Sequence, residues 1–294
     1  MTEIKGVLTA MVTPFTADGT LDLDSARSLA RHLVDNGSHG LVVTGTTGEA
    51  PTLSDTEKLR LLEAVLEEVG DRATVISGTG SADTHHTAEL SGKAARAGAH
   101  ALIVVTPYYN KPNPAGLRAH FETVAETASD TPIVLYNIPS RCVINMPPDF
   151  LAELAAAIPN VVAVKQANND DLGPIEGLDV LAGNDEIFLR TLEMGGGGGV
   201  LVASHVVGNE MRAIYDAIAS GDSGRATEIN EELRPIYEML TITSNPIPVK
   251  TALEMLGVIE AHMRLPMVPA TEDERATVRE TLERQGMLAG SAAS

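Results

Sequence analysis

The sequence contains no tryptophan, one cysteine and four phenylalanines in 294 residues. Because Cys142 is alone, an intrachain disulfide is excluded. No apolar run approaches the roughly 20 residues that a membrane-spanning helix requires. The N-terminal stretch lacks the basic start and the small-residue cleavage site of a signal peptide. We therefore expect a cytoplasmic protein that does not enter a membrane.

Basic side chains are also scarce, with 21 lysines and arginines against 40 aspartates and glutamates, and the formal net charge is −19. Binding to a phosphate backbone needs clustered Lys and Arg. The sequence contains neither a basic stripe nor a group of aromatic residues on which bases could stack. These features argue against nucleic acid as a partner, and the acidic balance is typical of a protein that stays in solution.

Short apolar runs recur along the chain, and each is followed by a polar break and then by a helical pattern. Near-continuous apolar strands are typical of a parallel sheet that is covered on its outer face. Eight such units predict a (β/α)8 TIM barrel, which typically takes about 250 residues. The runs lie at 6–14, 40–48, 74–80, 101–107, 132–139, 161–167, 179–185 and 199–204.

The segments between these runs have helical patterns. The strongest begins at Ser54, which forms a capping-box pattern with Glu57. An open doubly wound sheet is the rival architecture, but the chain has no P-loop motif, and GTGSAD (78–83) lacks the third glycine of a dinucleotide fingerprint. Further helices are expected at 24–36, 84–97, 115–128, 148–158 and 210–220.

The strand pattern stops after residue 221. We therefore expect a catalytic barrel, 1–221, and a C-terminal helical region, 222–294, with helices at 223–243, 249–256 and 271–285. The glycine run 195–199 could cradle a phosphate. It more simply gives a tight entry into the last strand, because glycine allows close approach of two backbones.

Polar groups gather where the predicted strands end. In a barrel of this kind the active site lies at the carboxyl ends of the strands. Hydroxyl, phenol, guanidinium and amine groups should therefore meet on one rim: Thr46, Thr47, Tyr109, Tyr136, Arg141 and Lys165.

Lys165 ends the apolar run VVAVK (161–165), although lysine is seldom buried. Burial disfavours the charged form of an amine, and a neutral amine attacks a ketone to form a Schiff base. The alternative is a buried ion pair with Asp170 or Asp171, and position alone does not decide between the two. The other lysines have simpler explanations as terminal, helical or loop residues: Lys5, Lys58, Lys93, Lys111 and Lys250.

Two neighbours of Lys165 favour covalent catalysis. A carbinolamine must lose water, and the resulting enamine needs a proton relay held close to it. Tyr136 ends the preceding strand, and its phenol could form such a relay with the Thr46 hydroxyl. Taken singly, Tyr136 could instead fill the core and Thr46 could shape a turn.

Several segments together resemble the family of 4-hydroxy-tetrahydrodipicolinate synthase, also called dihydrodipicolinate synthase. The match spans nearly the whole chain, in order. GTTGE and a lysine on the sixth strand are shared with the wider superfamily of pyruvate-dependent class I aldolases, which includes N-acetylneuraminate lyase; the other segments are more specific. The matching segments are GTTGE (45–49), VTPYYNKP (105–112), LYNIPSR (135–141), the strand ending in Lys165, NPIPVK (245–250) and RLPMVP (264–269).

The resemblance implies a lyase of lysine and diaminopimelate biosynthesis. In this family Lys165 would condense with pyruvate as a covalent imine, with no further cofactor and no metal. Thr47 and the main chain near Val200 would hold the pyruvate carboxylate. The alternatives are another 2-keto-acid aldolase acting on sugar acids, and a non-catalytic metabolite-binding barrel in which Lys165 is unreactive.

The resemblance also implies how protons and the second substrate are handled. Tyr136 would move protons, and Thr46 would link it to Tyr109, which a neighbouring subunit of a homotetramer supplies. Arg141 would bind the carboxylate of L-aspartate 4-semialdehyde, since its planar fork suits two-pronged binding. The product would be 4-hydroxy-tetrahydrodipicolinate.

Some positions depart from the family pattern. Gln166, Asn168 and Asn169 stand where members often carry an acidic residue and a small hydroxyl residue followed by glycine. We expect these three positions to border the site and to bear on the choice of second substrate. Cys142 follows the arginine in place of a hydroxyl residue, and packing is the simpler interpretation of its thiol.

A second group of departures concerns regulation. Relatives that are inhibited by L-lysine bind it with residues that correspond here to Ala50, Lys58, Ala82 and His86. The substitutions remove two acceptors, for which Asp55 or Asp83 could partly compensate, and Lys58 would repel a cationic ligand. We therefore expect the protein to be insensitive to L-lysine.

Overall fold

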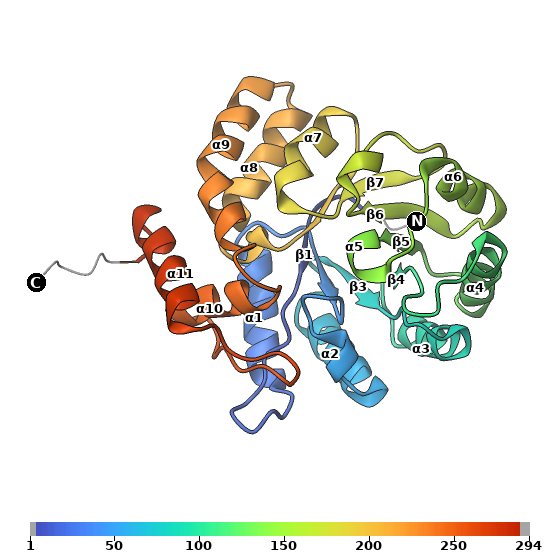
Figure 1. The fold of residues 1–294 in the computed structure, drawn as a ribbon, viewed down its shortest axis with the longest axis horizontal. Coiled ribbons are helices and arrows are strands. Elements are labelled where there is room, and N and C mark those ends of the chain that lie inside the picture. The colour runs from blue at the N-terminus through green and yellow to red at the C-terminus, as the bar shows by residue number, and fades with distance from the viewer. Residues whose placement is uncertain (1–3, 289–294) are drawn as a thin grey trace, which may run out of the picture.

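The structure is a computed structural model that describes residues 4–288. Eight parallel strands close into a barrel in chain order, so the predicted (β/α)8 barrel is confirmed (Figure 1). Every predicted apolar run coincides with a strand, and only the last strand begins one residue early. The strands are β1 Gly6–Ala10, β2 Gly40–Val43, β3 Thr74–Gly78, β4 Ala101–Val105, β5 Ile133–Asn137, β6 Val161–Gln166, β7 Asp179–Ala182 and β8 Gly198–Leu201.

Helices follow the strands and form an outer ring (Figure 1). The capping box of Ser54 and Glu57 is formed in both directions. The sequence patterns missed α5 and α7, which are four and six residues long, because so few turns show no apolar period. The ring helices are α1 Leu23–Asp35, α2 Asp55–Val69, α3 Thr84–Arg96, α4 Pro114–Thr127, α6 Pro148–Ala157, α7 Phe188–Glu193 and α8 Gly208–Ala219. The short α5 Pro139–Cys142 follows β5 and lies inside the ring (Figure 1).

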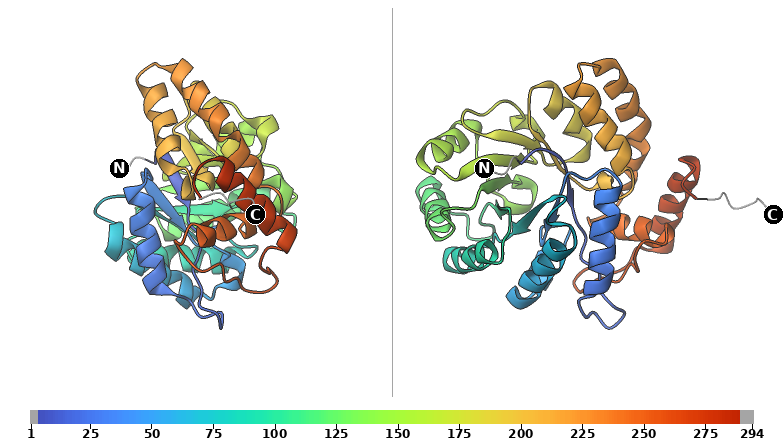
Figure 2. Two further views of the ribbon diagram at one scale, coloured as in Figure 1. Left: turned by 90° about the vertical axis from the view of Figure 1, so that its left-hand side faces the viewer. Right: turned by 180° about the vertical axis from the view of Figure 1, so that it is seen from behind.

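In the described part of the chain, three more helices follow the barrel, as expected: α9 Ser223–Met239, α10 Ile247–Met255 and α11 Glu272–Arg284. Helix α9 packs along α8, and α11 packs against both α10 and α9. Figures 1 and 2 show α10 and α11 outside the ring, on the side of α9. Since α8 and α9 pack across residue 221, a division of the chain at this point stays a prediction.

The glycine run 195–199 gives a tight entry into the last strand, which was the simpler of the two interpretations of the sequence. Strand β8 pairs with β1 and places Gly198 opposite Gly6. Gly198 has a φ of 149°, and a Cβ added there would collide with the Gly6 carbonyl oxygen. Glycine is therefore required for the two backbones to approach and for the barrel to close.

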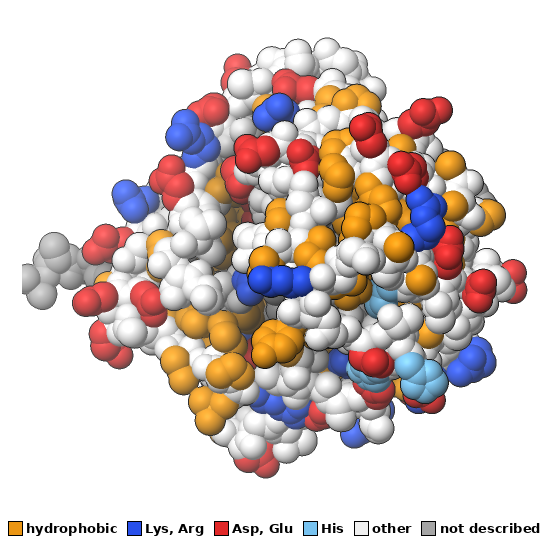
Figure 3. Space-filling model, turned by 45° about the vertical axis from the view of Figure 1, so that its right-hand side comes forward, with side chains coloured by type: hydrophobic (Ala, Val, Ile, Leu, Met, Phe, Trp, Pro, Cys, Tyr) orange, Lys and Arg blue, Asp and Glu red, His pale blue; other side chains and the backbone are white. Residues whose placement is uncertain are grey.

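The outer surface is acidic, in keeping with the composition. On the face in Figure 3, acidic side chains are scattered widely, with isolated basic side chains among them. Among residues 4–288, no helix has the length and apolar character needed to cross a membrane.

Candidate active site

A cavity of about 830 Å³ lies at the carboxyl ends of the strands. It brings together six of the seven candidate residues: Thr46, Thr47, Tyr136, Arg141, Lys165 and Val200. One wall comes from the C-terminal region and includes Asn245 and Met267. The C-terminal region therefore completes the cavity, which the sequence interpretation had assigned to the barrel alone.

Lys165 and Tyr136 lie side by side inside the barrel. They are register partners on β6 and β5, and the Lys165 Nζ lies 4.3 Å from the centroid of the Tyr136 ring. Both side chains are buried, with exposed fractions of 6% and 7%. The two-residue alternation of a strand explains the placement, because Ala163 also faces the barrel interior while Val164 faces the outer helices.

The ion-pair alternative for Lys165 is not observed. Within residues 4–288, Lys165 forms no ion pair with Asp170 or Asp171. Asp171 instead accepts hydrogen bonds from Asn145 (2.6 Å) and Asn168 (2.9 Å). The buried amine is therefore free of a direct carboxylate partner in the described part of the chain.

Lys250 has a larger role than the sequence predicted, since we expected only a residue near the start of a helix. Its side chain is fully buried, and its Nζ donates to Glu49 Oε1 at 2.5 Å and to the His262 carbonyl at 2.7 Å. Burial lowers the pKa of Lys250, and the neighbouring Glu49 opposes that shift. Among residues 4–288 two lysines are thus buried, and a carboxylate partner distinguishes Lys250 from Lys165.

The two threonines of GTTGE differ in their contacts. Thr47 is buried, and its Oγ1 accepts a hydrogen bond of 2.9 Å from Asn245 Nδ2. Thr46 is half-buried and lines the cavity together with Tyr136. No direct hydrogen bond joins Thr46 to Tyr136 among residues 4–288, so the expected relay stays a prediction.

Arg141 and Cys142 lie next to each other in α5 with different exposure. Arg141 is exposed at the wall of the cavity, where its guanidinium can reach a ligand at the mouth. Cys142 is buried, and burial raises the pKa of its thiol to about 11. A thiol that stays protonated at neutral pH is a weak nucleophile, which supports the packing interpretation.

Asp185 supports the rim near Val200, a role that the sequence interpretation missed. Its Oδ1 accepts hydrogen bonds from the backbone N–H groups of Val202 (2.9 Å) and Ala203 (3.0 Å). Burial raises the pKa of Asp185 to about 6, and the hydrogen bonds from the backbone of Ala203 and Val202 oppose the shift. The carboxylate fixes the backbone directly after β8.

Tyr109 is the one candidate that the cavity does not include. Its side chain is 88% exposed, and its backbone has a φ of 68°, in the left-handed region that non-glycine residues seldom adopt. The adjacent Tyr108 does line the cavity. The loop therefore directs Tyr109 away from the site of its own chain.

Gln166, Asn168 and Asn169 do not line the cavity, contrary to our expectation that they border the site. Gln166 is buried on the outer side of the barrel, where its Oε1 accepts from Asn137 Nδ2 (3.0 Å) and from the backbone of Asn168 (3.1 Å). Asn169 donates to Glu186 at 3.1 Å. These amides connect the loops after β5, β6 and β7, so their effect on substrate choice can only be indirect.

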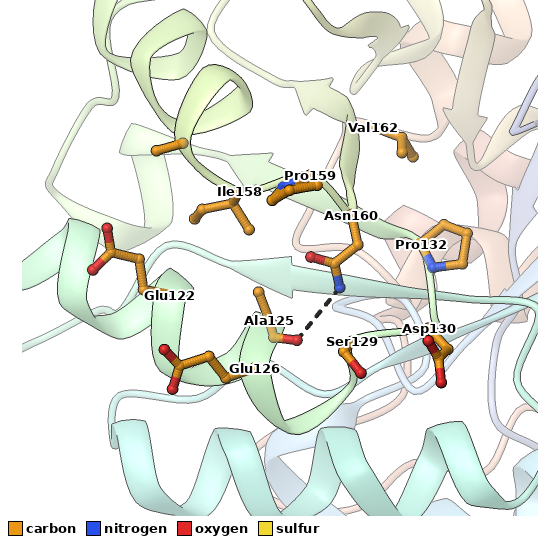
Figure 4. A pocket seen from close by; sticks show the side chains of 11 residues that line it. Glu122, Ala125, Glu126, Ser129, Asp130, Pro132, Ile158, Pro159, Asn160 and Val162 are labelled. Carbon is orange, nitrogen blue, oxygen red and sulfur yellow. Dashed lines mark hydrogen bonds between the residues drawn. The ribbon is translucent and has the colours of Figure 1, made fainter.

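A second hollow, of about 530 Å³, lies at the opposite end of the barrel between α4 and the start of β6 (Figure 4). Asn160 spans it and donates to the carbonyls of Ala128 and Thr131, each at 3.1 Å. Glu122 and Glu126 lie along its rim. Because residues at the amino ends of barrel strands serve stability, we assign the catalytic site to the first cavity.

The closed barrel and the cavity that contains Lys165 at the carboxyl ends of its strands define the class of protein: a (β/α)8-barrel enzyme. The dihydrodipicolinate synthetase family matches residues 3–285. The chain belongs to this family, and it is an enzyme of the lyase class.

Individual relatives agree with this assignment. The 4-hydroxy-tetrahydrodipicolinate synthase of Symbiobacterium thermophilum is 48% identical over 288 residues, which cover 96% of this chain and 98% of the relative. That of Moorella thermoacetica is 47% identical over 290 residues, with the same coverage. The solved dihydrodipicolinate synthase of Cyanidioschyzon merolae, described with lysine bound, superposes with a TM-score of 0.93 at 37% identity and covers 97% of this chain and 99% of its own.

Proposed function

We propose that this enzyme condenses pyruvate with L-aspartate 4-semialdehyde to 4-hydroxy-tetrahydrodipicolinate, through an imine on Lys165. The observation that carries the proposal is the buried Lys165 amine, which lies over the Tyr136 ring in the cavity without a direct carboxylate partner among residues 4–288. Relatives of nearly equal length that bear the name 4-hydroxy-tetrahydrodipicolinate synthase support the choice of substrates.

The first half of the reaction joins pyruvate to the enzyme. The Lys165 amine adds to the ketone carbon of pyruvate, and loss of water leaves a protonated imine. Removal of a proton from the methyl group then gives an enamine. Tyr136 is the group placed to carry these protons, with Thr46 as its partner on the cavity wall. No metal or organic cofactor is required, because the imine itself draws electrons from the methyl carbon.

The second half joins the two substrates and frees the lysine. The enamine carbon attacks the aldehyde carbon of the semialdehyde, and the aldehyde oxygen takes up a proton. The amine of the second substrate then attacks the imine carbon, which closes the ring and expels the Lys165 amine. Thr47 and the backbone near Val200 hold the carboxylate of pyruvate, and Arg141 holds that of the semialdehyde.

The role of Arg141 gives a direct test of substrate choice. With Arg141→Ala we expect the KM for the semialdehyde to rise on the order of 10- to 100-fold, because a charge-assisted hydrogen bond is lost. Formation of the pyruvate imine should continue. Arg118→Ala is the matched control, since Arg118 pairs with Glu153 on the outer helices, away from the cavity.

The alternative activity is cleavage or synthesis of sugar acids by another pyruvate-dependent aldolase. The same cavity and lysine would serve it, so a rate measurement has to separate the two. We expect rapid turnover of pyruvate with the semialdehyde and little cleavage of N-acetylneuraminate. The opposite preference would contradict the proposal at the level of the second substrate.

The assembly is also a proposal. Tyr109 is exposed and lies outside the cavity of its own chain. We propose that it enters the active site of a second subunit within a homotetramer, where it extends the relay of Thr46 and Tyr136. A cytoplasmic location stays a prediction from the sequence.

A further inference from the structure

We infer that Asn245 is a positioning residue for pyruvate, because it fixes the Thr47 hydroxyl as a hydrogen-bond donor toward the pyruvate carboxylate. The inference rests on the proposed function, since it assigns a device that orients the first substrate. Asn245 lies in the C-terminal region, 198 residues away from Thr47 in the sequence.

The direction of one hydrogen bond carries the argument. Asn245 Nδ2 donates to Thr47 Oγ1 at 2.9 Å. An amide nitrogen can only donate, whereas a hydroxyl has one proton to donate and can accept as well. The Thr47 oxygen is therefore the acceptor, and its own proton has no other side-chain or backbone acceptor among residues 4–288.

The location of the Thr47 hydroxyl, whose proton has no acceptor within residues 4–288, suggests an anionic ligand. Thr47 is 2% exposed, and both residues line the cavity that contains Lys165. A buried hydroxyl whose proton is held away from protein acceptors is ready to donate to a ligand. A carboxylate accepts hydrogen bonds only, so the arrangement suits the carboxylate of a 2-keto acid.

Asn245 is held in this position from the other side. Lys250 lies near the start of α10 and forms the buried ion pair with Glu49. Glu49 is two residues after Thr47. The two segments are thus joined both at Asn245–Thr47 and at Lys250–Glu49. The Asn245 Oδ1 is buried and has no hydrogen-bond partner among residues 4–288, so within this part of the chain the Asn245 side chain is tied to Thr47 through its N–H group.

The chemistry of Asn245 makes an isosteric test possible. In Asn245→Asp the carboxylate can only accept, so the Thr47 hydroxyl would donate its hydrogen bond to the new carboxylate instead of to pyruvate. The variant would also add a negative charge beside the pyruvate carboxylate. We expect the KM for pyruvate to rise on the order of 10- to 100-fold, with a smaller change in kcat. The pyruvate dependence of borohydride trapping on Lys165 should shift in parallel.

A double-mutant cycle separates this role from a merely structural one. Asn245→Ala removes the amide, and Thr47→Val removes the hydroxyl. If Asn245 acts through Thr47, each single variant raises the KM for pyruvate, and the double variant is no worse than Thr47→Val alone. The Tm of each variant, measured by thermal unfolding, shows whether it is folded at the assay temperature.

The outcomes are distinct. An unchanged KM for pyruvate in Asn245→Asp, or KM effects of Asn245→Ala and Thr47→Val that multiply in the double variant, would overturn the role of Asn245. Should Asn245→Asp fail to fold, the cycle with Asn245→Ala decides alone. A wild-type protein that forms no pyruvate adduct on Lys165 would instead overturn the proposed function and this role with it.

Discussion

Lys250 Nζ lies 2.5 Å from Glu49 Oε1, and the two side chains are 0% and 2% exposed. This pair ties α10 to the loop that carries Thr46 and Thr47, across 201 residues of sequence. The chain therefore uses one buried lysine to hold the site together and leaves the other, Lys165, without a direct carboxylate partner among residues 4–288. The contrast separates a structural amine from the one that we propose to be reactive.

The first prediction concerns stability. Removing one partner of a buried ion pair leaves an uncompensated charge and costs about 3–5 kcal/mol. Lys250→Met should therefore lower the free energy of unfolding by about this amount, measured by denaturant titration. The control is Lys93→Met, because Lys93 pairs with Glu89 at 3.5 Å on an exposed helix face. Loss of this exposed pair should cost less than about 1 kcal/mol. Equal effects of the two variants would contradict a structural role for the Lys250–Glu49 pair.

A second prediction concerns acid. The Arg264 guanidinium, whose NH2 lies 2.5 Å from Glu57 Oε1, lowers the pKa of Glu57 to about 2 from its ordinary value of 4.5. A lowered carboxyl pKa contributes stability that is present above the unfolded value and is lost as pH falls toward the folded value. The pair should thus stabilise the protein above about pH 4.5 and cease to do so near pH 2.

Glu57→Gln tests this dependence, because glutamine can keep the capping box with Ser54 while it removes the charge. The wild type should be more stable than the variant at neutral pH, and the difference should shrink as pH falls from about 4.5 to about 2. Urea unfolding at several pH values measures it. A difference that does not change with pH would show that the ion pair is not its source.

A third prediction follows from the exposure of Tyr109. If Tyr109 serves a neighbouring subunit, Tyr109→Phe should lower kcat on the order of 100-fold. Lys165→Ala should be inactive. Co-expression of the two variants should restore on the order of a quarter of the wild-type rate, because random pairing in a two-fold dimer creates sites that contain both side chains. A mixture no more active than its parts would contradict contribution between subunits.

The fourth prediction concerns feedback by L-lysine. Asp55, which could have offered an acceptor to an amine, already contacts His86 Nε2 at 2.9 Å and lies 3.8 Å from Lys58 Nζ. A cationic ligand would have to displace these groups and approach Lys58 against charge repulsion. We expect no saturable inhibition of the initial rate by L-lysine up to millimolar concentration at neutral pH. Clear saturation would indicate a different pocket.

The fold could be predicted from the sequence because its signals are local. Each strand of the barrel is a short apolar run, and α2 begins at a capping box that needs only Ser54 and Glu57. The short α5 and α7 could not be recognised in the sequence, because four and six residues form too few turns to show a helical period.

The site could be predicted only in part. Lys165 and Tyr136 were found because each ends an apolar run, and parallel strands bring such ends together. The contacts of Glu49 and Asn245 could not be found in this way, since their partners lie about 200 residues away in the sequence. The position of Gln166 was mistaken for a different reason: the two-residue alternation places Lys165 inside the barrel and its neighbour outside.

The most direct test of the central claim is to identify the lysine that binds pyruvate. The protein is incubated with pyruvate, reduced with borohydride and digested, and the modified peptide is mapped by mass spectrometry. We predict a pyruvate-dependent adduct on Lys165, which Lys165→Ala abolishes while the fold is retained. An adduct on Lys250 or Lys111, or no adduct that depends on pyruvate, would contradict the account.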